Sequence, residues 1–208
     1  PTPIIAGNVS FYNESKSGSI PPSPIVSCLG KINDISNVVT MSFKSPGSKI
    51  FMIGKRKDEL GGSLYYSLHK ELGANVPNPN IDEVKGQIYA ITDSIDNNLI
   101  NACHDISDGG VAIALSEMTF ENNIGCSVNI SGKLSVEKLL FSETGGFIIE
   151  VIDSNVDAIK KIFQNCNLGI DLIGETTKEK YIKMNDKIDL STEEAKKLWL
   201  NGLRDKIK

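Results

Sequence analysis

Two patterns of apolar and polar positions divide the chain near residue 44. Before this point, the runs at 3–7, 24–32 and 38–43 are short, apolar or β-branched, and bounded mostly by proline or glycine, which is typical of β-strands. A polar stretch rich in serine, glycine and proline separates the first two and predicts a loop. Three strands bury too little surface for a core of their own, so we expect them to complete a sheet formed by another part of the protein.

Beyond a turn at Pro46 and Gly47, strands and helices intermingle without a strict repeat. Apolar runs predict strands at 49–54, 126–130, 146–152, 168–176 and 181–186, and we expect the last two to pair as a hairpin. Apolar positions three or four residues apart, together with capping signals, predict helices at 62–73, 80–100, after Asp108, at 135–143, at 155–166 and from Ser191 onward.

This order of elements predicts an α+β fold of mixed α/β layers, in which helices pack on a sheet. We place a domain boundary at the turn, so that residues 1–44 form the end of one domain and residues 45–208 form the next. The chain begins with Pro1 close to an apolar run, and we expect it to be a segment of a longer protein.

The formal net charge of −4 argues against nucleic acid and anionic membrane as partners, because both attract basic faces. No run approaches the roughly 20 apolar residues of a membrane span. The four cysteines stand far apart without a CxxC pair, and the chain has only two histidines. This pattern argues against a zinc site and favours reduced thiols in a cytoplasmic protein.

The HDISDGG motif at 104–110 comes directly before an apolar helical run and has three open interpretations. Ser107 or Asp108 could simply cap a buried helix. Alternatively, the two aspartates could hold Mg²⁺ against a phosphate at the helix start, where paired glycines permit close approach. His104 could also act as an acid or base, although a buried, hydrogen-bonded imidazole is the commoner fate. The residues of the phosphate and metal interpretation are Asp105, Asp108, Gly109 and Gly110.

The GNVS motif at 7–10 is a second candidate for a binding surface. Gly7 permits close approach of a ligand, Asn8 offers an amide oxygen to a cation, and Ser10 offers a hydroxyl. In a strand, Asn8 and Ser10 would project from the same face, which fits a binding surface or a solvated edge.

Two further glycine pairs lie in the segments ELGGS at 59–63 and SETGG at 142–146. The first could bind an anion at a helix start, and an ordinary loop and cap explain it equally well. The second reads as a tight turn that leads into a strand. Neither segment matches a P-loop or a GxGxxG fingerprint.

Taken together and in order, these motifs resemble one enzyme family over essentially the whole chain. HDISDGGVAIALSEM, AGNVSFYNES, IPPSPIVSCLG, LGGSLYY and FSETGGFIIEV are similar to the C-terminal half of phosphoribosylformylglycinamidine synthase. That family belongs to the aminoimidazole ribonucleotide synthetase-like superfamily of ATP-dependent enzymes. The resemblance implies that residues 1–44 end the second N-type, ATP-binding domain and that 45–208 form the second C-type domain.

The resemblance also implies an activity, that of an ATP-dependent carbon–nitrogen ligase of purine biosynthesis. Formylglycinamide ribonucleotide, ATP and glutamine-derived ammonia would give formylglycinamidine ribonucleotide, ADP and phosphate. A glutaminase subunit and a small accessory subunit would supply the ammonia, and Mg²⁺ would accompany ATP. The alternatives are another superfamily member, of selenophosphate synthetase or thiamine-phosphate kinase type, and a non-catalytic nucleotide-binding scaffold module.

By position, the resemblance implies that Gly7 contacts ATP, Asn8 helps to hold Mg²⁺ and Ser10 contacts the substrate. HDISDGG would lie in the pseudo-symmetric copy of the nucleotide site, as an auxiliary phosphate or Mg²⁺ site. The catalytic residues would lie outside this segment, so we expect these 208 residues alone to be inactive.

Overall fold

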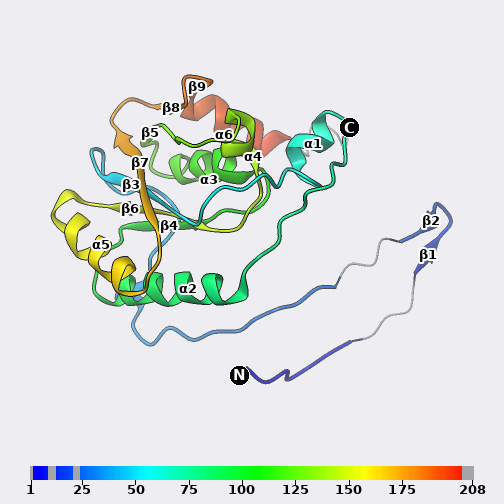
Figure 1. Cartoon of the computed structure of the whole chain (residues 1–208), viewed down its shortest axis with the longest axis horizontal. Helices are drawn as coiled ribbons and strands as arrows, with labels where there is room; N and C mark the ends of the chain where they lie inside the picture. The colour runs from blue at the N-terminus through cyan, green and yellow to red at the C-terminus, as the bar shows by residue number, and fades with distance from the viewer. Residues whose placement is uncertain (1, 9–12, 21–23, 203–208) are drawn as a thin grey trace. The chain divides into compact units, whose positions relative to one another are not determined.

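The structure is a computed structural model that describes residues 2–8, 13–20 and 24–202. The chain divides into two compact units, residues 1–33 and residues 34–208 (Figure 1). The predicted domain boundary at 44/45 remains a prediction.

The described residues of the first unit hold little regular structure. Strands β1 (Glu14–Ser15) and β2 (Gly18–Ser19) form a short antiparallel hairpin. The strands predicted at 3–7 and 24–32 are not formed, and side chains such as Ile4, Ile25 and Leu29 are about nine-tenths exposed. A strand needs neighbouring strands to pair its backbone groups, and the described residues of this unit offer these apolar runs no such sheet.

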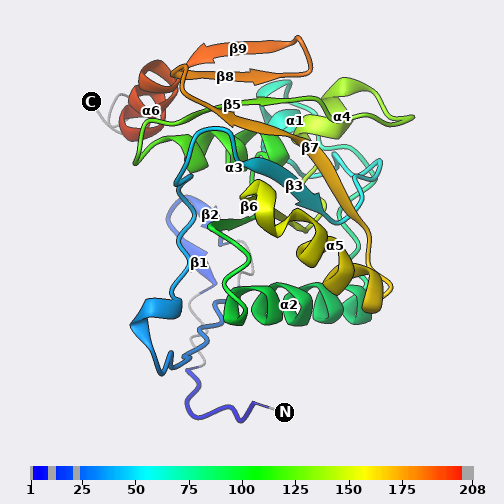
Figure 2. The same cartoon turned by 90° about the vertical axis from the view of Figure 1, so that its left-hand side faces the viewer.

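The second unit is built on a seven-stranded sheet in the order β4-β6-β3-β7-β5-β8-β9 (Figure 2). All neighbouring strands are antiparallel except β5 and β8, which are parallel. The strands are β3 (Lys49–Ile53), β4 (Ala102–Asp105), β5 (Gly125–Val128), β6 (Phe147–Val151), β7 (Ile170–Thr177), β8 (Tyr181–Met184) and β9 (Ile188–Ser191).

Helices pack on both faces of this sheet, and strand β3 contributes residues to the core on each side. Ile50 and Met52 of β3 belong to the core cluster that includes residues of α3, α4 and α6, whereas Phe51 and Ile53 belong to the cluster that includes residues of α2 and α5. The helices are α1 (Leu64–Leu68), α2 (Ile81–Asp96), α3 (Gly110–Thr119), α4 (Val136–Phe141), α5 (Val156–Asn165) and α6 (Thr192–Asn201), with 3-10 turns η1 (Ile35–Asn37) and η2 (Asp153–Asn155). The predicted α+β fold of mixed layers is confirmed.

The predicted hairpin between 168–176 and 181–186 is wrong, because β5 lies between β7 and β8. Two glycines allow this insertion. A Cβ atom at Gly174 of β7 would lie 2.1 Å from the Ser127 carbonyl oxygen of β5. A Cβ atom at Gly125 would lie 2.0 Å from the carbonyl oxygen of Glu179, in the connection that leads to β8. Close backbone approach at both glycines therefore places the connection across β5.

Other differences from the prediction are local. Strand 38–43 forms only one isolated bridge, between Thr40 and Ala102. Helix α1 ends at Leu68 rather than near Gly73, and α2 ends at Asp96 rather than near residue 100. Side chains Ser63 and Ser191 cap α1 and α6 as predicted. None of the helices in the described part of the chain is long and apolar enough to cross a membrane.

Candidate functional site

The described part of the GNVS motif lies in the first unit. Gly7 and Asn8 are exposed in backbone without regular structure, and Ser10 lies outside the described residues. A Cβ atom added at Gly7 would meet no other atom within 4 Å. The unit therefore gives no packing reason for a glycine at position 7, and the binding roles of Gly7, Asn8 and Ser10 stay predictions.

The HDISDGG motif lies in the second unit, between an edge strand and a buried helix. His104 and Asp105 end β4, and helix α3 begins at Gly110. Capping by Ser107 or Asp108 is wrong: the N-cap is Gly109, which has φ 76° and makes no side-chain capping bond. A left-handed residue at this place favours glycine, so the chain enters the helix through backbone geometry rather than through a side-chain cap.

His104 is held between two carboxylates and is largely buried, which fits the structural interpretation of this residue. Its Nδ1 atom lies 3.2 Å from Asp105 Oδ1, and its Nε2 atom lies 2.9 Å from Glu117 Oε2 of α3. The Trp199 indole N–H of α6 donates to the other oxygen of Glu117 at 2.7 Å. This network joins β4, α3 and α6, and it occupies both ring nitrogens of His104.

Three of the sequence motifs meet at Glu143. Its Oε1 atom accepts hydrogen bonds from the Gly109 N–H at 2.9 Å and from the Leu64 N–H at 2.8 Å. Gly109 belongs to HDISDGG, and Leu64 begins α1 directly after the ELGGS segment. A carboxylate is favourable at a helix start, where backbone N–H groups lack partners within the helix.

The backbones of HDISDGG and SETGG also touch directly. The Ile106 N–H donates to the Gly146 carbonyl at 2.8 Å. Gly110 has φ 68°, and a Cβ atom there would lie 2.7 Å from the Leu140 carbonyl oxygen. The paired glycines suggested a close approach at this point of the sequence, and the structure shows one at Gly110. The approaching group is the backbone at Leu140 rather than a ligand.

The SETGG segment is held by hydrogen bonds to two buried charged residues, Arg56 and Glu59. The Thr144 hydroxyl donates to Glu59 Oε2 at 2.7 Å, and the Arg56 guanidinium donates to the carbonyl oxygens of Thr144 and Gly145. Burial lowers the pKa of Arg56 to about 10, and the nearby Glu59 carboxylate opposes this shift. Arg56 is thus a buried cation that fixes the loop containing Glu143, a role no local sequence pattern signalled.

The aspartates of HDISDGG do not form a complete metal site by themselves. Asp105 and Asp108 are exposed, and the described residues include no group of three or more His, Cys, Asp or Glu placed to hold a metal ion. The Gly109 N–H, which a phosphate at this helix start would need, is already donated to Glu143. The auxiliary phosphate or Mg²⁺ role of Asp105, Asp108, Gly109 and Gly110 therefore stays a prediction.

Two hollows in the second unit lie away from HDISDGG. One of about 700 Å³ crosses the exposed sheet face at β5, β7, β8 and β9. Another of about 240 Å³ lies between the start of α2 and the Thr144–Gly145 turn, with Glu59 and Gln87 in its walls. Neither is lined by a residue of the HDISDGG motif.

Comparison with protein families matches residues 45–187 to the C-terminal domain of AIR synthase related proteins. The chain is 40% identical over 214 aligned residues to phosphoribosylformylglycinamidine synthase subunit PurL of Methanothrix thermoacetophila, covering 100% of this chain and 28% of that protein. It is 32% identical to the PurL subunit of Alkaliphilus metalliredigens, covering 98% of this chain and 28% of that protein. The chain thus spans little more than a quarter of the length of these relatives.

Solved structures of Thermotoga maritima PurL share the fold. The complex with FGAR superposes with a TM-score of 0.68 at 17% identity, covering 78% of this chain and 30% of that one. The complex with ATP gives 0.60 at 17% identity, covering 78% and 28%. The structure of T. maritima PurLQS gives 0.61 at 19% identity, covering 76% and 27%. At these identities the likeness concerns the fold alone.

Proposed function

The chain belongs to the AIR synthase related protein family, and on this premise we propose that it is part of a phosphoribosylformylglycinamidine synthase of the PurL type. One observation carries the proposal: similarity to a PurL subunit at 40% identity runs through 100% of the chain, beyond the matched domain. This similarity favours the synthase over the selenophosphate and thiamine-phosphate enzymes and over a scaffold module.

The proposed reaction is the ATP-dependent amidation of formylglycinamide ribonucleotide. The γ-phosphate of ATP passes to the formyl amide oxygen, and ammonia then displaces phosphate to form the amidine. ADP and inorganic phosphate are the other products. Such a transfer needs an in-line arrangement and neutralisation of phosphate charge, which bound Mg²⁺ supplies.

Within this reaction we assign the GNVS motif to substrate binding. Gly7 would let ATP approach the backbone, Asn8 would offer its amide oxygen to Mg²⁺, and Ser10 would contact the ribonucleotide. The exposure of Gly7 and Asn8 and the open space at Gly7 support these roles. Asp105, Asp108, Gly109 and Gly110 would form the auxiliary phosphate or Mg²⁺ site. It can use the Gly109 N–H only if Glu143 releases it.

Ammonia would come from a glutaminase subunit assisted by a small accessory subunit. The only adjacent Cys–His pair in the chain, Cys103–His104, does not suit glutamine hydrolysis. Burial, with a smaller contribution from Asp105, raises the pKa of the Cys103 thiol to about 12, whereas a nucleophilic cysteine needs a lowered pKa. We also place the protein in the cytoplasm, where exposed thiols such as Cys28 and Cys166 stay reduced.

Steady-state kinetics of the complete natural protein with its glutaminase and accessory subunits tests the proposal. We expect glutamine- and ATP-dependent conversion of formylglycinamide ribonucleotide, and none from the 208-residue chain alone. In the complete protein, Asn8→Ala should raise the Mg²⁺ concentration needed for half-maximal rate, with the melting temperature unchanged. Asn37→Ala, an exposed site in η1, is the matched control. Absence of turnover by the complete assembly would refute the proposed function.

A further inference from the structure

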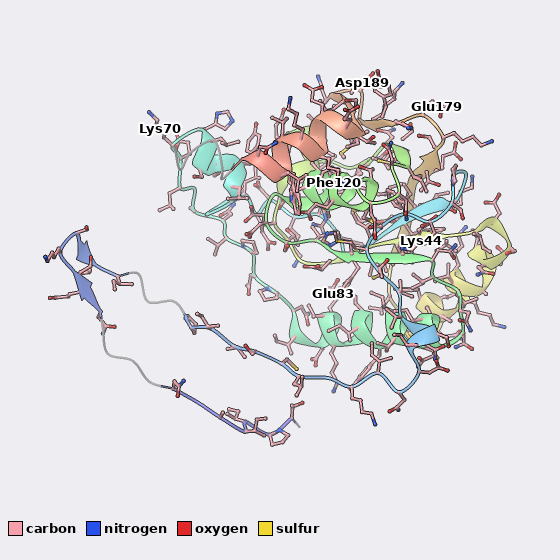
Figure 3. All side chains as sticks on the ribbon, turned by 180° about the vertical axis from the view of Figure 1, so that it is seen from behind. Lys44, Lys70, Glu83, Phe120, Glu179 and Asp189 are labelled. Atoms are coloured by element: carbon pink, nitrogen blue, oxygen red, sulfur yellow. The ribbon has the colours of Figure 1, made fainter. Side chains whose placement is uncertain are left out.

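The hollow of about 240 Å³ at the start of α2, which we call the α2 pocket, has no lining residue with a role in the proposed reaction. Charged and amide side chains reach it from two segments. Lys55, Lys57 and Glu59 follow β3, and Glu83 and Gln87 lie on the first turns of α2, where Figure 3 labels Glu83. Because a water molecule takes about 30 Å³ in the liquid, the pocket has room for a ligand of about eight non-hydrogen atoms.

Gln87 is a buried polar side chain in the wall of this pocket, and its hydrogen bonds are incomplete. Only 4% of the residue is exposed, and its amide N–H donates to Glu83 Oε1 at 3.3 Å. Within the described part of the chain, no group donates to the amide oxygen of Gln87. A buried amide oxygen without a donor is unfavourable, and the α2 pocket is the open space beside it. An N–H group of a ligand in the pocket would supply the missing bond.

Glu59 adds a buried carboxylate to the same wall and is held in place by the chain around it. Its Oε2 atom accepts from the Thr144 hydroxyl at 2.7 Å, and its Oε1 atom accepts from the Asn78 N–H at 3.3 Å. The nearby Arg56 guanidinium balances the charge of Glu59 and donates to the Gly145 carbonyl at 3.0 Å. Each carboxylate oxygen has two lone pairs, so Oε1 can accept a further N–H group. This wall is therefore formed before a ligand binds.

Two exposed lysines, Lys55 and Lys57, give the pocket a cationic rim. The lysine ion pairs among the described residues use Lys49, Lys138 and Lys183, so neither rim lysine has a carboxylate partner within 4 Å there. A lysine ammonium binds carboxylate through charge-assisted hydrogen bonds. The pocket therefore combines buried acceptors with free cations, and this combination suits a ligand that carries both N–H donors and a carboxylate.

We propose that the α2 pocket binds a small amino acid or a similar short zwitterion. The ammonium group of the ligand donates to the Gln87 amide oxygen and to the carboxylates of Glu59 and Glu83. Its carboxylate lies between Lys55 and Lys57. A ligand with only one of these groups leaves either the buried acceptors or the lysines without a partner. The inference does not depend on the proposed function, because it involves neither ATP nor the ribonucleotide.

Titration of the 208-residue chain with L-threonine, followed by ¹H–¹⁵N NMR, tests the ligand class. We expect saturable shifts of the Gln87 side-chain amide and the Gly145 backbone amide, with a dissociation constant of about 1 mM. Two analogues each lack one charged group: 3-hydroxybutyrate lacks the ammonium, and 1-amino-2-propanol lacks the carboxylate. Each should bind at least about tenfold more weakly. Equal affinity for either analogue, or no saturable shift with L-threonine up to about 50 mM, would overturn the proposal.

Variants of the 208-residue chain then test the residues. The double variant Lys55→Gln/Lys57→Gln changes only exposed side chains, so we expect an unchanged melting temperature and at least about tenfold weaker binding of L-threonine. Lys133→Gln, on an exposed loop, is the matched control and should bind like the parent chain. Gln87→Met keeps the side-chain volume and removes the amide oxygen, so it should weaken binding to a similar extent. Unchanged affinity in the lysine double variant, which does not alter the core, would overturn the proposed site whether or not Gln87→Met folds.

Discussion

Glu143 offers a direct test of how the motif loops are held together. Glu143→Ala removes the acceptor for two backbone amides, those of Leu64 and Gly109, which lie 2.8 and 2.9 Å from Oε1. Glu143→Gln keeps an oxygen at the same place but removes the charge. The pair therefore separates the hydrogen bonds from the electrostatic effect.

The expected losses differ in size. A hydrogen bond to a charged group contributes about 1.5–3 kcal/mol, and because Glu143 is only half-buried we take the lower end for each bond. Glu143→Ala should thus reduce the free energy of unfolding by about 3 kcal/mol. Glu143→Gln should cost about 1 kcal/mol, since it loses mainly the interaction of the charge with the start of α3.

Urea denaturation followed by circular dichroism measures both values, with an unchanged dependence on urea concentration as the sign that the unfolded state is unaffected. Amide chemical shifts of Leu64 and Gly109 give a local readout. Lys133→Ala, on an exposed loop, is a suitable control. Equal losses for the two variants, or a loss below about 0.5 kcal/mol for Glu143→Ala, would show that these bonds do not hold the loops.

Two further predictions concern glycine and cysteine. Gly110→Ala should lower the free energy of unfolding, measured by urea denaturation, by about 2–4 kcal/mol, because the residue has φ 68° and its Cβ would lie 2.7 Å from the Leu140 carbonyl oxygen. Gly7→Ala should change it by less than about 0.5 kcal/mol, because a Cβ atom there meets no other atom. Similar losses in the two variants would contradict the argument from close approach at Gly110. Burial raises the pKa of Cys103 and Cys126 from 9.0 to about 12, so the folded state keeps these protons while the unfolded state loses them above pH 9. The contribution of these thiols to the free energy of unfolding should be complete below pH 9 and should be lost as the pH rises from 9 to 12. This loss should be smaller in the Cys103→Ala/Cys126→Ala double variant. An equal loss in the double variant would show that other groups cause it.

Sequence patterns predicted elements well where the signal lies within the element itself. Strand β3 follows from its continuous apolar run, α2 from the spacing of its apolar residues, and the start of α6 from the cap at Ser191. Strand β4 was missed because its four residues, ACHD, end in two polar side chains, of which His104 is held between carboxylates and Asp105 is exposed. Within α2 the apolar positions do not coincide with the buried face, since Ile81 and Ile88 are exposed while Gln87 and Ser94 are buried.

The candidate site was only partly predictable, because its contacts join residues that lie far apart in the sequence. Close packing around Gly110 could be expected from the paired glycines, but the contact between Glu143 and Gly109 joins residues 34 positions apart. Glu150 accepts a hydrogen bond from the Lys44 N–H, which is 106 positions away. Such contacts depend on which strands become neighbours in the sheet, and the insertion of β5 between β7 and β8 shows that chain order does not decide this.

The alternation of β3 between two cores has a consequence for how the second unit unfolds. Ile50 and Met52 contribute to one core and Phe51 and Ile53 to the other, and β3 is the third of seven strands in the sheet. A shift of β3 by a single residue would move each set into the opposite core, so pairing with β6 is specified from both sides at once. Because both cores include residues of β3, disruption of one core also disturbs the strand on which the other core packs. The helices on the two faces of the sheet should therefore unfold in one cooperative transition.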